Sequence, residues 1–242
     1  MNTRLMPALL ALIGISCLAH PSRADSFWEI RVGAKGALTG NLWAEPNEAP
    51  ARSDPFWGDD QFFVGGGGGI FAEVNFFGFV GLELDLLFEA NSLTFNETIN
   101  YFEYDYDTHF TQLRVPILVK GTVPLGPVEL SLGIGPEFVV GLSADVGFEI
   151  HTALSAAQKA QALAQLEGLY GAEKANGTFL DLDLGVSISV WKLFIPIDLR
   201  AGINLDQSEN YPDRVDLAGN RATVKAIESF HFSLQVGVGW VF

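Results

Sequence analysis

The stretch HFSLQVGVGWVF, residues 231–242, alternates apolar and small or polar side chains without interruption. Starting one residue earlier, the apolar face consists of Phe230, Phe232, Leu234, Val236, Val238, Trp240 and Phe242. A period of two over more than ten residues is typical of a β-strand whose two faces meet unlike surroundings. The stretch also ends on an aromatic residue, whereas soluble domains usually end in a polar tail. It therefore predicts a strand in a wall with one apolar and one polar side.

The same alternation recurs in seven further segments. They are residues 27–40, 61–76, 80–95, 109–123, 128–142, 178–191 and 195–206. In the sixth of these, Leu180, Leu182 and Leu184 alternate with Asp181 and Asp183. Together with the terminal segment, the pattern predicts eight amphipathic strands.

The connections between the predicted strands alternate in length. Tight turns are expected at 75–79, 124–127 and 191–194, and long polar loops at 41–60, 96–108, 143–177 and 207–225. With an even number of strands, the turns and both chain ends lie on one side and the long loops on the other. Aromatic residues gather on the short-turn side, where a girdle at lipid headgroups is expected. They are Trp28, Phe76, Phe77, Phe79, Trp191, Phe194, Trp240 and Phe242.

Residues 1–24 are typical of a secretory signal peptide. Arg4 supplies the positive start, residues 9–17 (LLALIGISC) form a short apolar core, and the tripeptide ending at Ala24 resembles a signal-peptidase site. We expect cleavage there, which leaves residues 25–242 as one β-barrel domain. The apolar core is too short for a transmembrane helix, and no later segment is sufficiently apolar and uncharged.

The composition excludes several classes of function. Removal of the signal takes away two arginines and no acid, which leaves 12 basic and 29 acidic residues, a net charge of −17 over 218 residues. So acidic a chain is not expected to bind nucleic acid. The single cysteine, Cys17, lies in the signal, so the mature chain has no disulfide and no thiolate metal site. The 48% apolar content, with 26 glycines and 19 phenylalanines, suits a wall that faces an apolar solvent.

Two soluble folds compete with a membrane barrel. A β-sandwich would use the aromatics as core, but it does not explain the alternation of short turns and long loops. A lipocalin-like barrel also has eight alternating strands, yet its interior is apolar and its exterior polar. Here the polar face carries glycine, serine and paired charges, which suit a narrow interior. We therefore expect an all-β fold, an eight-stranded antiparallel up-and-down transmembrane β-barrel with short periplasmic turns and long extracellular loops.

In its signal peptide, amphipathic strands, loop alternation and terminal VGVGWVF, the chain resembles the small outer-membrane β-barrel proteins of Gram-negative bacteria, the OmpX-like and PorT-like superfamily. The resemblance covers residues 25–242. It implies location in the cell outer membrane, contact with lipid and lipopolysaccharide, and insertion by the barrel-assembly machinery. Val238, Trp240 and Phe242 are similar to the assembly signal of such proteins. The resemblance implies no particular activity, because the superfamily shares none.

We expect a structural or surface-interaction role, without catalysis or a cofactor, for which the sequence identifies no extracellular partner. A narrow conduit for small or hydrophobic solutes is an alternative, because loop aromatics could line a mouth. These aromatics are Trp43, Phe56, Trp57, Tyr101, Tyr104 and Tyr106. A lipid-modifying enzyme is a weaker alternative, since outer-membrane deacylases carry a His-x-Ser pair such as His231 and Ser233. No acid follows Ser233 to orient the histidine.

Charged residues on the polar face occur at matched depths on neighbouring strands. Counted from the short turns, the pairs are Arg31 with Glu73, Glu83 with Lys120, Glu89 with Arg114, and Asp183 with Arg200. The interior of an eight-stranded barrel is just wide enough for its side chains to fill. Because an isolated charge there is costly to desolvate, we expect these residues to form a salt-bridge network that fills the interior. A proton or ion path is the alternative.

Three remaining motifs suggest structure more than chemistry. The run GGGGG at 65–69 is followed by Ile-Phe rather than Lys-Ser, so it predicts relief of crowding or strand bending instead of a phosphate site. Ser155 and Gln158 form a capping box that opens a short helix in the third long loop, over 155–171. That helix caps the barrel mouth, meets a partner or stays solvated. The acidic run EYDYD at 103–107 is solvated or binds divalent cations. No other motif for a metal or cofactor is present.

Overall fold

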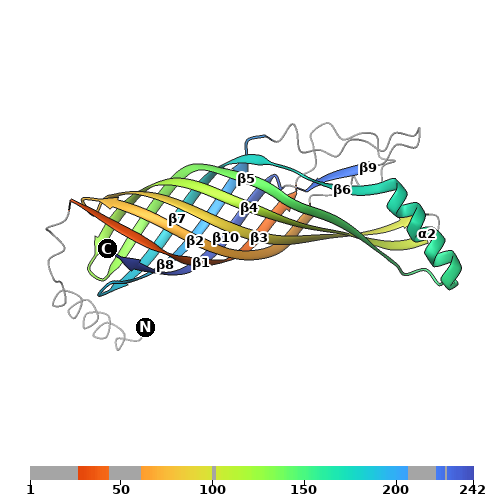
Figure 1. Ribbon diagram of the computed structural model, residues 1–242, viewed down its shortest axis with the longest axis horizontal. Helices are drawn as coiled ribbons and strands as arrows, with labels where there is room; N and C mark the ends of the chain where they lie inside the picture. Colours follow the sequence, from red (N-terminus) through yellow and green to blue (C-terminus); the bar gives the residue numbers. More distant parts are fainter. Residues whose placement is uncertain (1–26, 44–60, 100–101, 207–221, 227) are drawn as a thin grey trace, which may run out of the picture.

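The computed structural model describes residues 27–43, 61–99, 102–206, 222–226 and 228–242, and eight of its strands close into an antiparallel barrel (Figure 1). The barrel strands are β1 (Trp28–Trp43), β2 (Gln61–Phe76), β3 (Val80–Ile99), β4 (Phe102–Leu125), β5 (Val128–Ile150), β7 (Gly177–Val190), β8 (Leu193–Asn204) and β10 (Phe230–Val241). Each pairs with its chain neighbours, and β1 pairs with β10 to close the wall. The predicted eight-stranded up-and-down barrel is confirmed. The predicted signal, residues 1–24, lies outside the described residues.

The wall of the barrel is apolar outside and polar inside. On β7, Leu180, Leu182 and Leu184 are 45%, 53% and 58% exposed, whereas Asp181 and Asp183 between them are fully buried. The same alternation runs along β10, where the burial pattern changes at every residue. A soluble barrel has the opposite arrangement, because water favours polar groups on the outside. The alternation read from the sequence therefore assigned each face to its correct side.

The short-turn end carries the predicted aromatic girdle with one correction. Its exposed members are Trp28, Phe77, Phe79, Trp191, Trp240 and Phe242, and Phe76 is half-buried. Phe194 was predicted among them, but it is 2% exposed and packs inside the barrel against Phe71, with ring centroids 6.1 Å apart. The cause is its even position on β8, which places it on the same face as Asp198.

The glycine run of β2 permits a close approach between two strands. A Cβ atom at Gly67 would lie 1.9 Å from the carbonyl oxygen of Phe88, and one at Gly69 would lie 1.8 Å from that of Leu86. Both oxygens belong to β3, the neighbouring strand. No side chain fits at such distances, so glycine here relieves crowding, as the sequence suggested.

The opposite end of the molecule is longer than predicted. β3, β4 and β5 continue past the barrel, so most of the expected loop at 96–108 is strand. The pairing of β3 with β2 stops at Asn91, and the pairing of β5 with β7 stops at Val139. Beyond these residues, β4 stays paired with both β3 and β5. A bulge at Thr111/Gln112 marks this departure. Along this part of β4, Tyr104 and Thr108 are buried, whereas Glu103 and His109 are exposed, so the extension also has one covered and one open face.

A small subdomain adjoins this extension. Helix α2 (Ala156–Leu169) is followed by β6 (Tyr170–Lys174), which pairs in parallel with β9 (Ala222–Ala226). The predicted capping box is present, because the Ser155 amide donates to Gln158 Oε1 at 3.1 Å and the Gln158 amide to Ser155 Oγ at 3.4 Å. The helix ends earlier than expected, and the parallel strand pair was not predicted.

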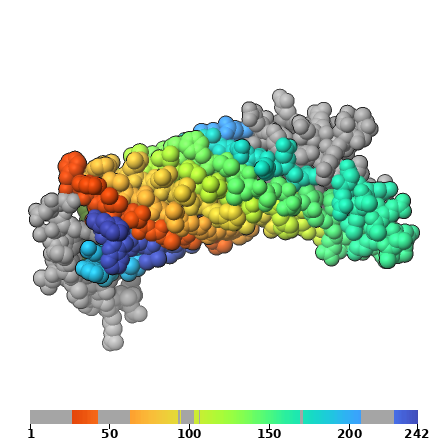
Figure 2. All heavy atoms as spheres, viewed as in Figure 1, coloured from red at the N-terminus to blue at the C-terminus, as the bar shows by residue number. Residues whose placement is uncertain are grey.

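The extension gives the molecule an elongated shape, with α2 far from the end where the C-terminus lies (Figures 1 and 2). Within the described parts of the chain, no helix is both long and apolar enough to cross a membrane.

Candidate functional site

The barrel interior, called the lumen below, is packed with ionisable side chains. Among the described residues, five basic side chains are buried, namely Arg31, Lys35, Arg114, Lys120 and Arg200. Ten buried carboxylates accompany them, namely Glu73, Glu83, Asp85, Glu89, Glu129, Glu137, Asp181, Asp183, Asp198 and Glu228. The alternation of the strands aims fourteen of them inward, and Glu228 joins them from just before β10. All except Asp181, which lies beside the upper cluster, divide into three clusters along the barrel. Carboxylates outnumber cations two to one.

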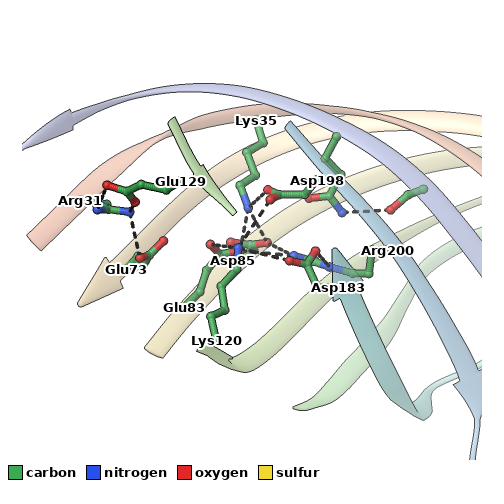
Figure 3. Close-up of polar contacts among 12 residues, drawn as sticks. Arg31, Lys35, Glu73, Glu83, Asp85, Lys120, Glu129, Asp183, Asp198 and Arg200 are labelled. Atoms are coloured by element: carbon green, nitrogen blue, oxygen red, sulfur yellow. Dashed lines mark hydrogen bonds and ion pairs between the residues drawn. The ribbon is translucent and has the colours of Figure 1, made fainter. Parts of the chain in front are cut away.

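The rim cluster lies nearest the short turns and is centred on Arg31. Its guanidinium contacts Glu29 at 2.6 Å, Glu73 at 3.3 Å and Glu129 at 2.7 Å. Figure 3 shows Arg31 between Glu73 and Glu129, which come from β2 and β5. Because β5 is not adjacent to β1 in the wall, the contact with Glu129 crosses the lumen. The Arg31 guanidinium also lies 4.4 Å from the centre of the Phe194 ring.

The middle cluster is the most highly connected part of the lumen (Figure 3). Lys35 contacts Glu83 at 2.7 Å, Asp198 at 2.9 Å and Asp85 at 3.4 Å. Lys120 and Arg200 bridge the same carboxylates and also reach Asp183, so three cations and four acids form one network. Its members come from β1, β3, β4, β7 and β8. The network ties together strands that do not pair.

The upper cluster lies toward the long-loop end and has a single cation. Arg114 contacts Glu89 at 2.7 Å, and its guanidinium also meets Glu137 and Glu228. Its Nη1 lies 3.1 Å from His231 Nδ1. All five side chains are buried, and Glu228 precedes β10 at the upper opening of the barrel. This cluster is strongly acidic, because three carboxylates surround one guanidinium.

The structure brings each of the four predicted pairs into contact. The N···O distances are 3.3 Å for Arg31–Glu73, 3.0 Å for Lys120–Glu83, 2.7 Å for Arg114–Glu89 and 3.4 Å for Arg200–Asp183. Sequence reasoning did not include Lys35, Asp85, Glu129, Glu137, Asp198 and Glu228 in the network. All but Glu228 lie on the polar faces of predicted strands, which was the available signal. Most of their partners lie on strands that are not adjacent, so a comparison of neighbouring strands did not find them. Glu137 on β5 is the exception, because its partner Arg114 lies on the adjacent strand β4.

His231 and Ser233, considered as a catalytic pair, both face the lumen and are each 2% exposed. His231 adjoins Arg114 and two carboxylates, whereas Ser233 accepts a hydrogen bond from Gln235 at 3.0 Å. Tyr104, named as a mouth aromatic, is buried in the extension, where its ring packs against Phe148. Phe56, Trp57 and Tyr101 lie outside the described residues.

The wall contains a pocket of about 300 Å³ beside the bulge of β4. It is lined by Val64, Ala90, Asn91, Ser92, His109, Phe110, Thr111, Ser143 and Asp145. These residues belong to β2, β3, β4 and β5, where the three-stranded extension separates from the barrel. Most of them are polar, although Val64 on the outer face is 56% exposed.

The extension carries an ion pair near its tip. His151 Nε2 donates to Asp105 Oδ2 at 2.8 Å, and this hydrogen bond raises the pKa of His151. Asp105 belongs to the acidic run at 103–107, which forms part of β4 and not a loop. The pair links β4 to the residue that follows β5, so it holds the two strands together beyond the barrel.

We expect this pair to weaken as the pH rises. A group whose pKa is raised by folding stabilises the fold fully below its unfolded pKa and loses that contribution as the pH passes its folded pKa. Asp105→Asn should therefore lower the pKa of His151, as measured by NMR titration of the imidazole protons in detergent. The exposed variant Gln161→Asn is the control and should leave that pKa unchanged. An unchanged pKa in Asp105→Asn would contradict the assignment.

Comparisons with known proteins give fold neighbours only. No family model and no curated protein matches the sequence. OprG, an outer membrane protein from Pseudomonas aeruginosa, is similar with a TM-score of 0.44 and 12% identity over 89% of this chain and 95% of its own. Ail, the attachment invasion locus protein of Yersinia pestis, has a TM-score of 0.38 and 11% identity over 90% of this chain and 100% of its own.

A third solved structure, neisserial surface protein A, has a TM-score of 0.36 and 10% identity over 90% of this chain and 98% of its own. All three are small eight-stranded outer-membrane barrels, the class that the sequence resembles. Identities and TM-scores this low carry no function over to this chain.

Proposed function

We propose that this chain is an integral outer-membrane β-barrel that acts from the cell surface. The location in the membrane is supported by the wall of the barrel, which exposes leucine and valine on its outside and buries ion pairs on its inside. Water would not stabilise such an exterior, whereas the hydrocarbon of a bilayer does. In this orientation the short turns and the aromatic girdle face the periplasm. The extension, α2 and the β6–β9 sheet then project outward beyond the lipopolysaccharide headgroups.

The route to the membrane follows from both ends of the sequence. Residues 1–24 direct export and are removed, and β10 presents the assembly signal to the barrel-assembly machinery. Val238, Trp240 and Phe242 support this role, because their side chains are 52%, 38% and 71% exposed on the outer wall. Exposed side chains remain available to a recognition surface before the barrel closes.

A surface role suits this molecule better than transport or catalysis. The three clusters occupy the lumen over much of its length, so an ion or solute crossing it would have to separate buried pairs. A lipid ester would likewise have to enter the barrel to reach Ser233. By contrast, the extension and its subdomain provide a large surface at the end that faces the environment. The wall pocket favours a conduit as a second candidate, with lateral exit of a small solute beside the bulge.

Planar-bilayer recordings of the refolded protein distinguish these candidates. We expect no steady single-channel conductance from the intact chain, because its lumen is filled. Arg114→Ala should admit a leak or destabilise the barrel, since three carboxylates lose their shared cation. Lys192→Ala, at an exposed turn position, should behave like the intact chain. Large, steady steps from the intact protein would contradict a closed lumen and favour the conduit.

A further inference from the structure

Three ligand-type side chains converge beside the upper cluster. They are Glu137 on β5, Asp181 on β7 and His231 on β10, all fully or almost fully buried. Asp181 and His231 both register against Gly202 of β8, the strand between β7 and β10. A Cβ at Gly202 would lie 2.3 Å from Asp181 Oδ1 and 2.3 Å from His231 Cε1. Glycine at this position thus leaves room for the carboxylate and the imidazole to approach each other.

The spacing of the three groups is longer than a hydrogen bond and close to that of metal ligands. His231 Nε2 lies 3.7 Å from Asp181 Oδ1 and 3.8 Å from Glu137 Oε1. Ligand atoms of all three residues lie within 4.8 Å of one another. Two zinc bonds at a tetrahedral angle separate their ligand atoms by about 3.3–3.5 Å. The two separations from His231 exceed this spacing by only a few tenths of an ångström.

Asp181 supplies an independent reason to expect a bound cation. Its side chain is fully buried, yet neither carboxylate oxygen accepts a hydrogen bond. A buried carboxylate without a donor is costly, and native proteins pair such groups with donors or metal ions. Both orphaned oxygens belong to the residue that faces His231 and Glu137, so the unmet acceptor capacity is directed at the proposed site.

The excess of carboxylates around Arg114 also favours a bound cation. Glu89, Glu137 and Glu228 surround Arg114, and Asp181 adds a fourth carboxylate. When all four are ionised, one guanidinium compensates one of their four charges. A divalent cation would compensate two more, and it would do so in a lumen where uncompensated charge is expensive.

We propose that Glu137, Asp181 and His231 bind one divalent first-row transition-metal ion, such as Zn²⁺, inside the barrel. An imidazole nitrogen with two carboxylates suits Zn²⁺, Mn²⁺ or Fe²⁺ better than Mg²⁺, which prefers oxygen ligands and retains its water. Ligation through Nε2 places the imidazole proton on Nδ1, so the Arg114 contact at Nδ1 opens on binding. Arg114 keeps Glu89 and Glu228. The ion joins β5, β7 and β10 across the lumen and is independent of the proposed surface role.

Metal analysis of the refolded protein tests this proposal. The full chain is refolded in detergent with a chelator, dialysed against Zn²⁺ or Mg²⁺, and analysed by mass spectrometry of the bound metal. We expect about one Zn²⁺ and no Mg²⁺ per folded chain. Asp181→Asn and His231→Gln should each weaken Zn²⁺ binding by at least about tenfold. His151→Gln, at the exposed pair on the extension, is the control and should bind like the intact chain.

A second readout separates lost ligands from lost folding. Folded barrels keep a distinct mobility on unheated gels, so binding is counted per folded chain. Gly202→Ala retains all three ligands but places a methyl group between two of them, so it should also weaken Zn²⁺ binding. Co²⁺ in place of Zn²⁺ should give visible absorption in the intact chain and not in Asp181→Asn. Absence of tightly bound Zn²⁺ from the intact chain, or equal binding by Asp181→Asn and His231→Gln, would overturn the proposal.

Discussion

Replacing Arg200 with methionine is expected to lower the free energy of unfolding by about 3–5 kcal/mol. The guanidinium is fully buried and contacts Asp85 at 2.9 Å, Glu83 at 3.3 Å and Asp183 at 3.4 Å. Methionine fills much of the same volume but leaves these carboxylates with less positive charge in the lumen. Equilibrium unfolding of the protein in lipid vesicles, followed by tryptophan fluorescence, measures the loss.

Two further variants identify the cause of that loss. Lys192→Met removes a cation from an exposed turn and should change stability by less than about 0.5 kcal/mol. The double variant Asp85→Asn/Arg200→Met should lose less free energy of unfolding than the two single variants lose together. The reason is that Asp85→Asn removes a carboxylate that the arginine had neutralised. Equal losses of stability for Arg200→Met and Lys192→Met would show that the ion pairs of Arg200 do not stabilise the middle cluster.

The barrel strands were predictable because the apolar and polar surroundings alternate at every residue. Residues 178–191 match β7 to within one residue at each end, since both faces of this strand have a fixed environment. The prediction was wrong beyond the barrel, where the polar residues at 96–108 were interpreted as a loop. β3 reaches Ile99 and β4 begins at Phe102, and these parts lie in the extension, beyond the two-sided wall.

The lumen was predictable only for residues on adjacent strands. Arg31 and Glu73 are direct cross-strand partners in register, so counting from the short turns found them. Lys35 instead reaches Glu83 and Asp198 on strands that do not adjoin β1. Which residues meet across a barrel depends on strand tilt and stagger, and these do not appear in the order of residues.

The proposed metal ligands illustrate the same limit. Glu137, Asp181 and His231 are far apart in the sequence, and each lies on the polar face of its own predicted strand. Their convergence depends on Gly202, whose missing side chain makes room between them. No spacing rule for metal ligands covers residues brought together in this way, so the sequence alone predicted no metal site at these three residues.

Arginine at Leu234 is expected to cost about 2–4 kcal/mol of stability, whereas arginine at Trp240 should cost about 0–1 kcal/mol. Both side chains face outward, and Leu234 is 47% exposed in the middle of β10. Trp240 lies near the short-turn end, where its ring packs edge-on against Trp191 with centroids 5.3 Å apart. If lipid surrounds the wall, a charge at Leu234 enters hydrocarbon, while one at Trp240 reaches headgroups and water. Equilibrium unfolding in vesicles measures both losses.

The contrast between these positions separates a membrane wall from any soluble barrel. In water, arginine at an exposed outward position is solvated at every height, so both variants would retain most of their stability. Gln161→Arg on exposed α2 is the control for an added positive charge and should have little effect, because it lies outside the barrel. Equal tolerance of arginine at Leu234 and Trp240 would contradict the lipid-facing assignment. A loss confined to Leu234 would instead place the middle of β10 at the depth of the hydrocarbon, because only there is the charge deprived of water.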